Sequence, residues 1–306
     1  MRVRPFVPTL AAVLLTALSL ACGRPSIPPP SLTAGDGTRV GTPQRLGPGL
    51  WMVPGGGGNS AVFETATGVV VVDPKFASSW NDLAAAIRTL TPKPVTHAIV
   101  THFHDDHASA AIVLPPEVEI VAHEFTLREM RTWGYLRADG NGPPVKTRGH
   151  SGFLTLFSGA DGITLLTPGP AHTGGDSFVV FHRARVMHAG DVFPDTMAPI
   201  VNIDGGGDGG RFAATLRTIV ASVSGVDRVI TGHGRVMAWT DLAQYADFMT
   251  LLVDYVGREM GMGRDKVQVF RALRVPPAFA GYDLSRMFET LDEIDRSLRP
   301  RWQRVF

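Results

Sequence analysis

A run of six residues constrains this chain more than any other feature of its sequence. Positions 102–107 read His-Phe-His-Asp-Asp-His, directly after a short apolar run that predicts a buried strand. In an extended loop, residues two apart point the same way, so His102 and His104 can face one metal ion together. Asp106 and His107 follow at once and offer ligands for a second ion nearby. Neutral imidazole and carboxylate are the ligands expected of zinc or a similar transition metal, so the run predicts a metal site.

The rest of the sequence predicts an α/β layered protein. Short apolar and β-branched runs predict strands, and apolar residues at helical spacing predict helices, the first of which Ser78 or Ser79 can cap. Because His and Asp clusters follow the predicted strands, we expect the site on loops at one edge of the sheets. The predicted strands are 50–53, 60–63, 69–72, 98–100, 118–122, 163–166, 178–181, 186–189 and 228–230, and the predicted helices follow Ser79, cover 211–220 and extend beyond Asp241.

The N-terminal residues have the pattern of an export signal. Arg2 and Arg4 precede an apolar stretch, Thr9–Leu20, that is too short for a transmembrane span. Cys22, the only cysteine, ends this stretch at the place where a bacterial lipoprotein signal is acylated; the alternative is an ordinary cleavage site. We therefore expect residues 1–22 to be a signal peptide, and the protein to be periplasmic or a membrane-anchored lipoprotein of a bacterium.

A linker and one domain follow the predicted signal. Residues 23–47 are rich in Pro and Gly, which predicts a semi-rigid linker, and residues 48–306 suit one domain with a helical C-terminal segment. The formal net charge of +1 does not supply the basic field that nucleic-acid binding requires. The expected partner is a small-molecule substrate, and no pattern in the sequence specifies an oligomeric state.

Three downstream motifs complete a pattern that resembles the metallo-β-lactamase superfamily. The 102–107 run matches the family's His-x-His-x-Asp-His signature. His172 lies in a Gly-Pro-Ala-His-Thr-Gly-Gly-Asp segment, Asp191 ends a His-Ala-Gly-Asp segment, and His233 lies in Thr-Gly-His-Gly. Asp73, after the run of valines, matches the family's aspartate at an early strand end. The resemblance covers nearly everything after the linker.

The resemblance implies a fold and a set of metal ligands. The family fold is an αβ/βα sandwich of two mixed β-sheets flanked by helices, with two zinc ions held at one edge. Asp73 is implied to orient the ligand imidazoles from behind. The implied ligands are His102, His104 and His172 for the first metal, Asp106, His107 and His233 for the second, and Asp191 as the bridge between them.

The resemblance also implies a binuclear metal-dependent hydrolase. A water between two cations loses a proton near neutral pH, and the resulting metal-bridging hydroxide can attack a carbonyl substrate. Asp106 is the implied catalytic residue, because its counterpart in related hydrolases steers the proton. Asp191 stands where true metallo-β-lactamases generally have cysteine or serine, and a signal segment does not suit a cytosolic glutathione thioester. These two features weigh against an antibiotic hydrolase and against a glutathione thioesterase, and the expected substrate stays a carbonyl compound of the lactam, lactone or thioester class.

Two other functions remain open at this stage. A persulfide dioxygenase uses the same fold with one iron, and a non-catalytic metal-binding protein would keep the fold without the chemistry. Gly205–Gly210 formally satisfies a dinucleotide-binding pattern but is interpreted as a loop before a helix. Gly55–Gly58 lacks the Lys-Ser/Thr of a phosphate loop and predicts a hairpin turn.

Several aromatic and histidine side chains are interpreted as structural. The aromatic residues of the C-terminal helical segment are expected to pack on the core rather than to cover the substrate. His123 and His188 are expected to make structural hydrogen bonds. His150 lies in a Gly-Pro-rich segment, 139–152, for which a loop over the site stays an alternative. The aromatic residues concerned are Trp239, Tyr245, Phe248 and Tyr255.

Overall fold

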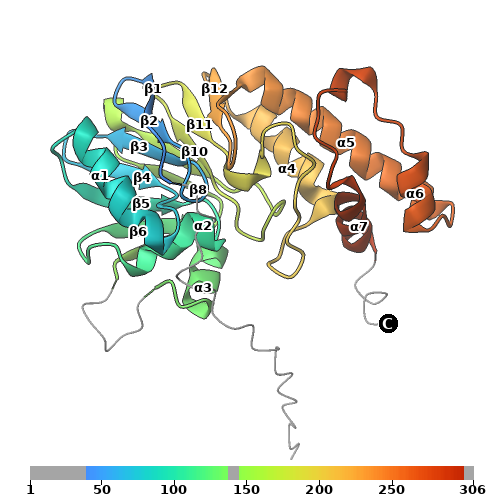
Figure 1. The fold of residues 1–306 in the computed structure, drawn as a ribbon, viewed down its shortest axis with the longest axis horizontal. Coiled ribbons are helices and arrows are strands. Elements are labelled where there is room, and N and C mark those ends of the chain that lie inside the picture. Colours follow the sequence, from blue (N-terminus) through green and yellow to red (C-terminus); the bar gives the residue numbers. More distant parts are fainter. Residues whose placement is uncertain (1–38, 137–144, 300–306) are drawn as a thin grey trace, which may run out of the picture.

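Two β-sheets lie face to face in the computed structural model of the protein, which describes residues 39–136 and 145–299 (Figure 1). Helices cover the outer face of each sheet. The chain therefore has the expected αβ/βα sandwich of two mixed sheets flanked by helices. The predicted signal peptide, Cys22 and most of the predicted linker lie outside the described residues.

The first sheet contains seven strands in the order in which they occur in the sequence. Strands β1 to β4 form an antiparallel meander, whereas β4 to β7 run parallel to one another. The loops that follow parallel neighbours therefore emerge at the same edge. The strands are β1 (Gln44–Gly47), β2 (Leu50–Val53), β3 (Ser60–Glu64), β4 (Val69–Val72), β5 (Val95–Val100), β6 (Glu119–His123) and β7 (Thr147–His150), with helices α1 (Trp80–Leu90), α2 (Asp105–Ala108) and α3 (Glu124–Thr132).

The second sheet contains six strands in the order β13-β12-β11-β10-β9-β8. Strands β11 and β12 pair in parallel through a crossover that contains helix α4 (Gly209–Ser222), and the other described neighbours are antiparallel. This sheet is therefore also mixed. Its strands are β8 (Phe153–Leu156), β9 (Ile163–Leu166), β10 (Phe178–Phe181), β11 (Val186–His188), β12 (Arg228–Ile230) and β13 (Met237–Ala238).

Strand β4 shows why the valine run Val69–Val72 does not alternate with polar residues. All four valines are fully buried. Two of them point into the core between the sheets, where Phe181 of β10 also lies, and the other two pack with Leu83 of α1. A strand buried on both faces reads as a continuous apolar run, and the run ends at the edge where the site is built.

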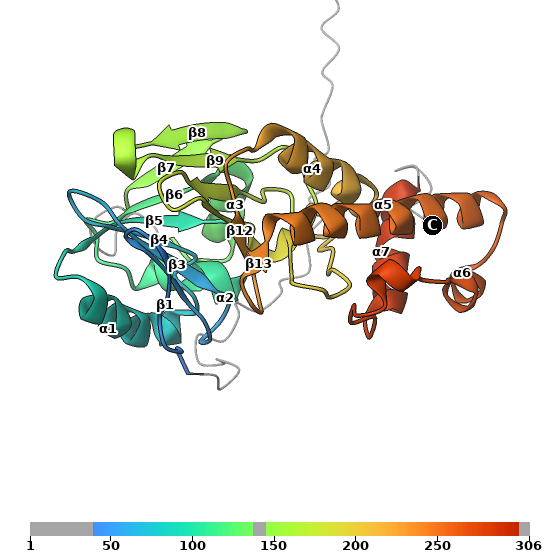
Figure 2. The same cartoon turned by 90° about the horizontal axis from the view of Figure 1, so that it is seen from above.

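Three C-terminal helices form a further apolar core on the outer face of the second sheet. Tyr245 and Phe248 are fully buried there, and Trp239 and Tyr255 pack against the same core, so the prediction of packing is confirmed. Helix α7 lies beside α4 and α5 (Figure 2). In the described ranges no helix has the length and apolar character of a bilayer span. The helices are α5 (Trp239–Gly261), α6 (Lys266–Ala272) and α7 (Met287–Leu298).

Several elements differ from the prediction. Strand β1 lies inside the predicted 23–47 linker, because Leu46 is buried and the strand pairs with β2. Ser79 occupies the position before α1, but its side chain makes no capping hydrogen bond, so the predicted cap is wrong. Helix α3 and strands β7 and β8 were not predicted, because α3 and β7 are polar and β8 buries only its last residue.

Candidate metal centre

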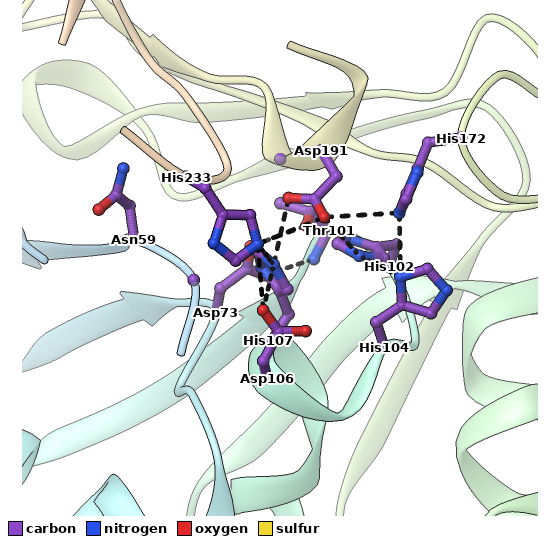
Figure 3. A network of polar contacts seen from close by, with 12 residues as sticks. Asn59, Asp73, Thr101, His102, His104, Asp106, His107, His172, Asp191 and His233 are labelled. Atoms are coloured by element: carbon purple, nitrogen blue, oxygen red, sulfur yellow. Dashed lines mark hydrogen bonds and ion pairs between the residues drawn. The ribbon is translucent and has the colours of Figure 1, made fainter. Parts of the chain in front are cut away.

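The seven predicted ligands lie on loops at one edge of the two sheets (Figure 3). The loop after β5 carries two histidines and leads into the short helix α2, which carries Asp106 and His107. The second sheet supplies the other three: His172 between β9 and β10, Asp191 in a short turn after β11, and His233 between β12 and β13. The structure thus brings together all seven residues that the sequence singled out.

Three imidazoles and one carboxylate form the first group, His102, His104, His172 and Asp191. The Nδ1 atom of His104 lies 3.2 Å from Nε2 of His102 and 2.9 Å from Nε2 of His172. The Oδ2 atom of Asp191 lies 3.7 and 3.5 Å from the same two Nε2 atoms. One donor atom from each side chain therefore faces a common point.

A second group, Asp106, His107 and His233, lies beside the first. The Oδ2 atom of Asp106 is 3.3 Å from Nε2 of His107 and 3.1 Å from Nε2 of His233. Asp191 reaches this group too, because its Oδ1 is 3.2 Å from Nε2 of His107 and its Oδ2 is 3.5 Å from Nε2 of His233. Asp191 thus lies between the two groups, where the sequence resemblance places a bridging ligand (Figure 3).

The ring nitrogens that point away from the centre show, through their hydrogen bonds, which opposite nitrogens can bind a cation. Nδ1 of His172 donates to the carbonyl of Ile200 at 2.8 Å, and Nδ1 of His107 lies 2.8 Å from the Asp73 carboxylate. A neutral imidazole that donates from Nδ1 presents a lone pair at Nε2. Lone pairs that face one another across 3 Å or so repel unless a cation or a proton lies between them. The donor set therefore fits divalent metal ions.

The carboxylates give the second group a surplus of negative charge. Burial disfavours a charge on His107, yet Asp106, Asp191 and Asp73 together raise its pKa well above the ordinary value. Hydrogen bonds from His233 to Asp106 and then to Asp191 raise the pKa of His233 to about 9. The carboxylates therefore attract a positive charge to these two rings, which a metal cation would supply.

Two rings of the first group, those of His102 and His104, stay uncharged. Burial, followed by the His107 imidazole, holds the pKa of His102 well below its usual range. Burial and then the His172 imidazole lower the pKa of His104 to about 3. Neutral rings are the form that ligates a metal, so these two rings need no deprotonation before binding near neutral pH.

Asp73 supports the ligands from behind, as the resemblance implied. It is fully buried at the end of β4, in a left-handed backbone conformation with φ 54°. Its Oδ1 accepts from the Thr101 backbone N–H at 2.7 Å, and its Oδ2 accepts from the Thr101 hydroxyl at 2.8 Å. The Thr101 hydroxyl lies 3.0 Å from Nδ1 of His102. One carboxylate therefore orients ligand rings in both groups.

Two asparagines near the ligands had no role assigned from the sequence. Asn59 donates from Nδ2 to the carbonyls of Thr231 and Gly234, both at 2.9 Å, and thereby holds the loop of His233. Asn202 places its Nδ2 2.8 Å from Nε2 of His104. No local signal predicts either contact, because the partners are far apart in sequence.

The glycine turn between β2 and β3 packs directly on the second ligand group. A Cβ atom at Gly58 would collide with the His107 ring, and the Gly58 N–H donates to the Asp106 carbonyl at 3.1 Å. The buried Lys75 donates to the Gly58 carbonyl at 2.6 Å and to the Val53 carbonyl at 2.9 Å. The predicted hairpin turn is confirmed, and it also forms one wall of the metal centre.

The remaining histidines lie where structural roles were expected. Nε2 of His188 lies 2.9 Å from the Asn59 carbonyl oxygen, and Nδ1 of His123 accepts from the N–H of Phe125 at the start of α3. His150 is buried at the end of β7, with its Nε2 3.3 Å from the Ser177 hydroxyl. Residues 147–150 therefore form a strand rather than a loop over the site; residues 137–144 lie outside the described ranges.

A cavity of about 410 Å³ lies away from the ligands, between α4, α5 and the Leu273-Arg274 segment. Charged side chains line much of it, including the pair of Arg217 and Asp247 at 2.7 Å. None of the seven ligands lines this cavity. It therefore has no part in the metal centre.

Comparison with known proteins adds one family and several relatives. Residues 53–233 match the family described as the metallo-beta-lactamase superfamily, a span that contains all seven ligands. The sequence is 27% identical over 145 residues to the alpha subunit of a 2,4-dinitroanisole O-demethylase from Nocardioides sp. (strain JS1661), which corresponds to 46% of this chain and 43% of that protein.

Two solved structures have a similar fold. The sec-alkylsulfatase Pisa1 from Pseudomonas sp. superimposes with a TM-score of 0.69 at 14% identity, over 84% of this chain and 50% of that one. A metallo-beta-lactamase from Pontibacter korlensis superimposes with a TM-score of 0.55 at 16% identity, over 68% of this chain and 98% of that one. The chain thus spans half or less of the length of the O-demethylase subunit and of the alkylsulfatase.

Proposed function

The chain belongs to the metallo-β-lactamase superfamily, and from that premise we propose that it is a binuclear metal-dependent hydrolase. The observation that carries the proposal is the position of Asp191, which lies within 3.7 Å of ligand nitrogens in both groups. Two complete groups that share one carboxylate suit two cations a short distance apart. Zinc is the metal we expect, because the donors are imidazole and carboxylate.

The proposed assignment uses every donor atom described above. Nε2 of His102, Nδ1 of His104 and Nε2 of His172 would hold the first metal. Nε2 of both His107 and His233, together with the carboxylate of Asp106, would hold the second. Asp191 would contribute to both sites. When bound, two such cations supply Lewis acidity that polarises the bond to be cleaved and acidifies a water molecule.

Exposure of the side chains indicates where a substrate approaches. The His102 and His172 side chains are each 1% exposed, whereas those of His233 and Asp106 are 47% and 17% exposed. The open side of the centre is therefore the side on which His233 and Asp106 lie. His107 and then the hydrogen bonds from His107 and His233 outweigh burial and keep the pKa of Asp106 below its usual range. Its ionised carboxylate can orient a nucleophilic water through a hydrogen bond.

The proposed substrate is a small molecule with a bond that a metal-activated water can cleave. A lactam, lactone or thioester carbonyl remains the expectation from the sequence. The two relatives add an aryl methyl ether and a secondary alkyl sulfate to the candidates, because one is a 2,4-dinitroanisole O-demethylase subunit and the other a sec-alkylsulfatase. Each of these bonds can in principle be cleaved by the attack of water, so a metal-activated water is a common nucleophile for all the candidates.

The first test is metal content by mass spectrometry on protein purified without added metal. It is paired with a hydrolysis screen of nitrocefin, lactones, thioesters, 2,4-dinitroanisole and a secondary alkyl sulfate. About two zinc ions per chain with hydrolysis of one substrate class would support the proposal. A single iron without hydrolysis would favour a persulfide dioxygenase-like enzyme, and a chain that binds no metal would contradict the proposal.

Single substitutions test the ligand assignment directly. We expect His104→Ala to lose about one metal per chain and Asp106→Ala to lower kcat/KM at least a hundredfold or so, because each removes a donor from one group. The control is His182→Ala, whose exposed ring contacts Thr164 away from the centre. Full activity of either ligand variant, in protein whose metal content is verified, would show that the assignment is wrong.

A further inference from the structure

We propose that helix α7 positions the ligands His104 and His172 through the segment Pro199–Asn202, with Thr290 and Glu293 as the positioning residues. This inference rests on the proposed function, because it concerns ligands of the proposed metal centre. The helix lies beyond residues 53–233, the part of the chain that matches the family. It is therefore a feature of this chain's C-terminal segment.

The segment Pro199–Asn202 touches both ligands. Its Ile200 carbonyl accepts from Nδ1 of His172 at 2.8 Å. The Asn202 N–H donates to the His172 carbonyl at 2.9 Å, and the Asn202 side-chain amide lies 2.8 Å from Nε2 of His104. The segment thus fixes the ring and the backbone of His172 and lies against the ring of His104.

The segment has no regular secondary structure of its own, so contacts from elsewhere must hold it. Helix α7 supplies two of them. The Thr290 hydroxyl donates to the Pro199 carbonyl at 2.8 Å, and the Glu293 carboxylate accepts from the Val201 N–H at 2.8 Å. Residues three apart lie on the same face of a helix, so one face of α7 holds the backbone on both sides of Ile200.

Helix α7 is itself held firmly against α4. Gly209 opens α4 so close to α7 that a Cβ atom there would lie 2.8 Å from Cα of Ile294. One turn further along α7, the Ser297 hydroxyl accepts from the Gly209 N–H at 2.9 Å. The helix can therefore act as a fixed reference for the loop between β11 and α4.

Burial makes the Thr290 contact sensitive to substitution. Thr290 is fully buried, and its hydroxyl is shared between the carbonyls of Pro199 and, at 3.1 Å, Arg286. A valine there keeps the shape of the side chain but leaves the Pro199 carbonyl without this donor. The segment would then lose one of its two tethers to α7, and His172 would lose part of its support.

The test measures the two zinc dissociation constants of the full chain by competition with a chelator. We expect Thr290→Val and Glu293→Leu each to weaken one constant severalfold and to leave the other unchanged. The effect should lie below the roughly 10–100-fold cost of removing a direct partner of a ligand. Thr290→Ser keeps the hydroxyl donor, and Glu293→Gln keeps an oxygen acceptor. Each of these two variants should therefore show the wild-type zinc dissociation constant.

Thr65→Val is the matched control. Thr65 is also buried, and its hydroxyl also donates to a backbone carbonyl, that of Gly68 at 2.9 Å, in the turn between β3 and β4. This variant should lose stability without change in either zinc constant. An equal effect of Thr65→Val and Thr290→Val on zinc binding would reduce the role of Thr290 to general stability and overturn the inference.

The outcomes separate this inference from the proposed function. A wild-type chain that binds no zinc contradicts the proposed function, and the inference falls with it. A wild-type chain that binds two zinc ions, with both constants unchanged in Thr290→Val and Glu293→Leu, overturns the inference alone. If Thr290→Val does not fold, the zinc dissociation constants of Glu293→Leu still test the inference. Glu293 is only half-buried, so its substitution disturbs the fold less.

Discussion

Glycine at position 58 is required by the ring beside it rather than by its own backbone. The site of a Cβ atom at Gly58 is occupied by the His107 imidazole, which Asp73 holds from the other side at 2.8 Å. Neither the ring nor the turn has room to move without disturbing a ligand. A methyl group added at position 58 should therefore disturb the metal centre as strongly as the loss of a hydrogen-bond partner of His107.

We expect Gly58→Ala to lower kcat/KM about tenfold or more and to reduce metal content, because the methyl group displaces the His107 ring. Activity and metal content are measured together. Gly281→Ala is the control, since no atom lies within 4 Å of the Cβ it would add. If both variants keep full activity and metal, the close packing of the turn on His107 has no consequence for the centre.

His150 gives the folded chain a pH dependence that does not involve the ligands. Burial, followed by the nearby His123 ring, lowers the pKa of His150 from 6.5 to about 4. Between these pH values the unfolded chain binds a proton that the folded chain does not, so the free energy of unfolding falls as the pH falls from 6.5 towards 4.

We expect the wild-type chain to lose on the order of 2 kcal/mol more stability than His150→Gln between pH 7 and pH 5. Glutamine carries no titratable proton, so the difference between the two chains isolates His150. Denaturant unfolding of both chains at each pH provides the measurement. Parallel pH profiles would mean that His150 titrates in the folded chain as it does in the unfolded one.

The loops between strands depend on partners in distant elements. Asn59, in the turn between β2 and β3, is 3% exposed and bonds to carbonyls on both sides of His233, a loop of the other sheet. Its backbone N–H also donates to the Gly232 carbonyl at 2.8 Å. One residue of the first sheet thus sets the position of a ligand that the second sheet carries.

We expect Asn59→Ala to lower the free energy of unfolding by about 1–3 kcal/mol, because the carbonyls of Thr231 and Gly234 lose their donor. In the proposed two-metal centre, the variant should also bind the second metal more weakly than wild type. Denaturant unfolding and zinc competition measure the two effects. Asn81→Ala, on the exposed face of α1, serves as the control and should change neither quantity.

The sequence predicts the elements that carry a strong local pattern. The Val69–Val72 strand and the strand before His102 were predicted because both are short apolar runs with clear ends, and the ligands were predicted because each lies in a recognisable motif. The contacts of Asn59 and Thr290 were not predictable in this way. Their partners are 172 and 91 residues away, and the hydrophobic periodicity of a segment does not indicate contacts at such a separation.

The polar elements α3 and β7 were missed for a related reason. Strand β7 reads Thr-Arg-Gly-His and lies at the end of the first sheet, so only one neighbouring strand stabilises it. Its conformation follows from pairing with β6 rather than from its own composition. Local propensity therefore could not identify it.

At the scale of the whole molecule, the candidate metal centre lies at one edge of the sandwich, where loops of both sheets meet. The first sheet supplies four ligands through the 102–107 run, and the second supplies His172, Asp191 and His233. Metal bound across this boundary favours the stacked arrangement over the unfolded chain, because the unfolded chain has no preformed site.

Removal of metal should therefore destabilise the entire fold. We expect a chelator to lower the Tm by on the order of 10 °C relative to protein in zinc at about a thousandfold above Kd. Differential scanning calorimetry is the measurement. The Tm of His104→Ala should fall less when the chelator is added, because this variant lacks one ligand. An unchanged Tm of the wild-type chain would show that metal binding does not contribute to stability.

The large sequence separation between ligands of one group has a consequence for the order of events during folding. His107 and His233 approach each other to 3.3 Å although 126 residues separate them in the chain. Contacts of such separation form late, since a long loop must close before they are made. A nascent chain that has completed only its first sheet has both ligand groups incomplete. In the proposed two-metal centre, tight uptake of the second ion would therefore mark the moment when the loop of His233 arrives.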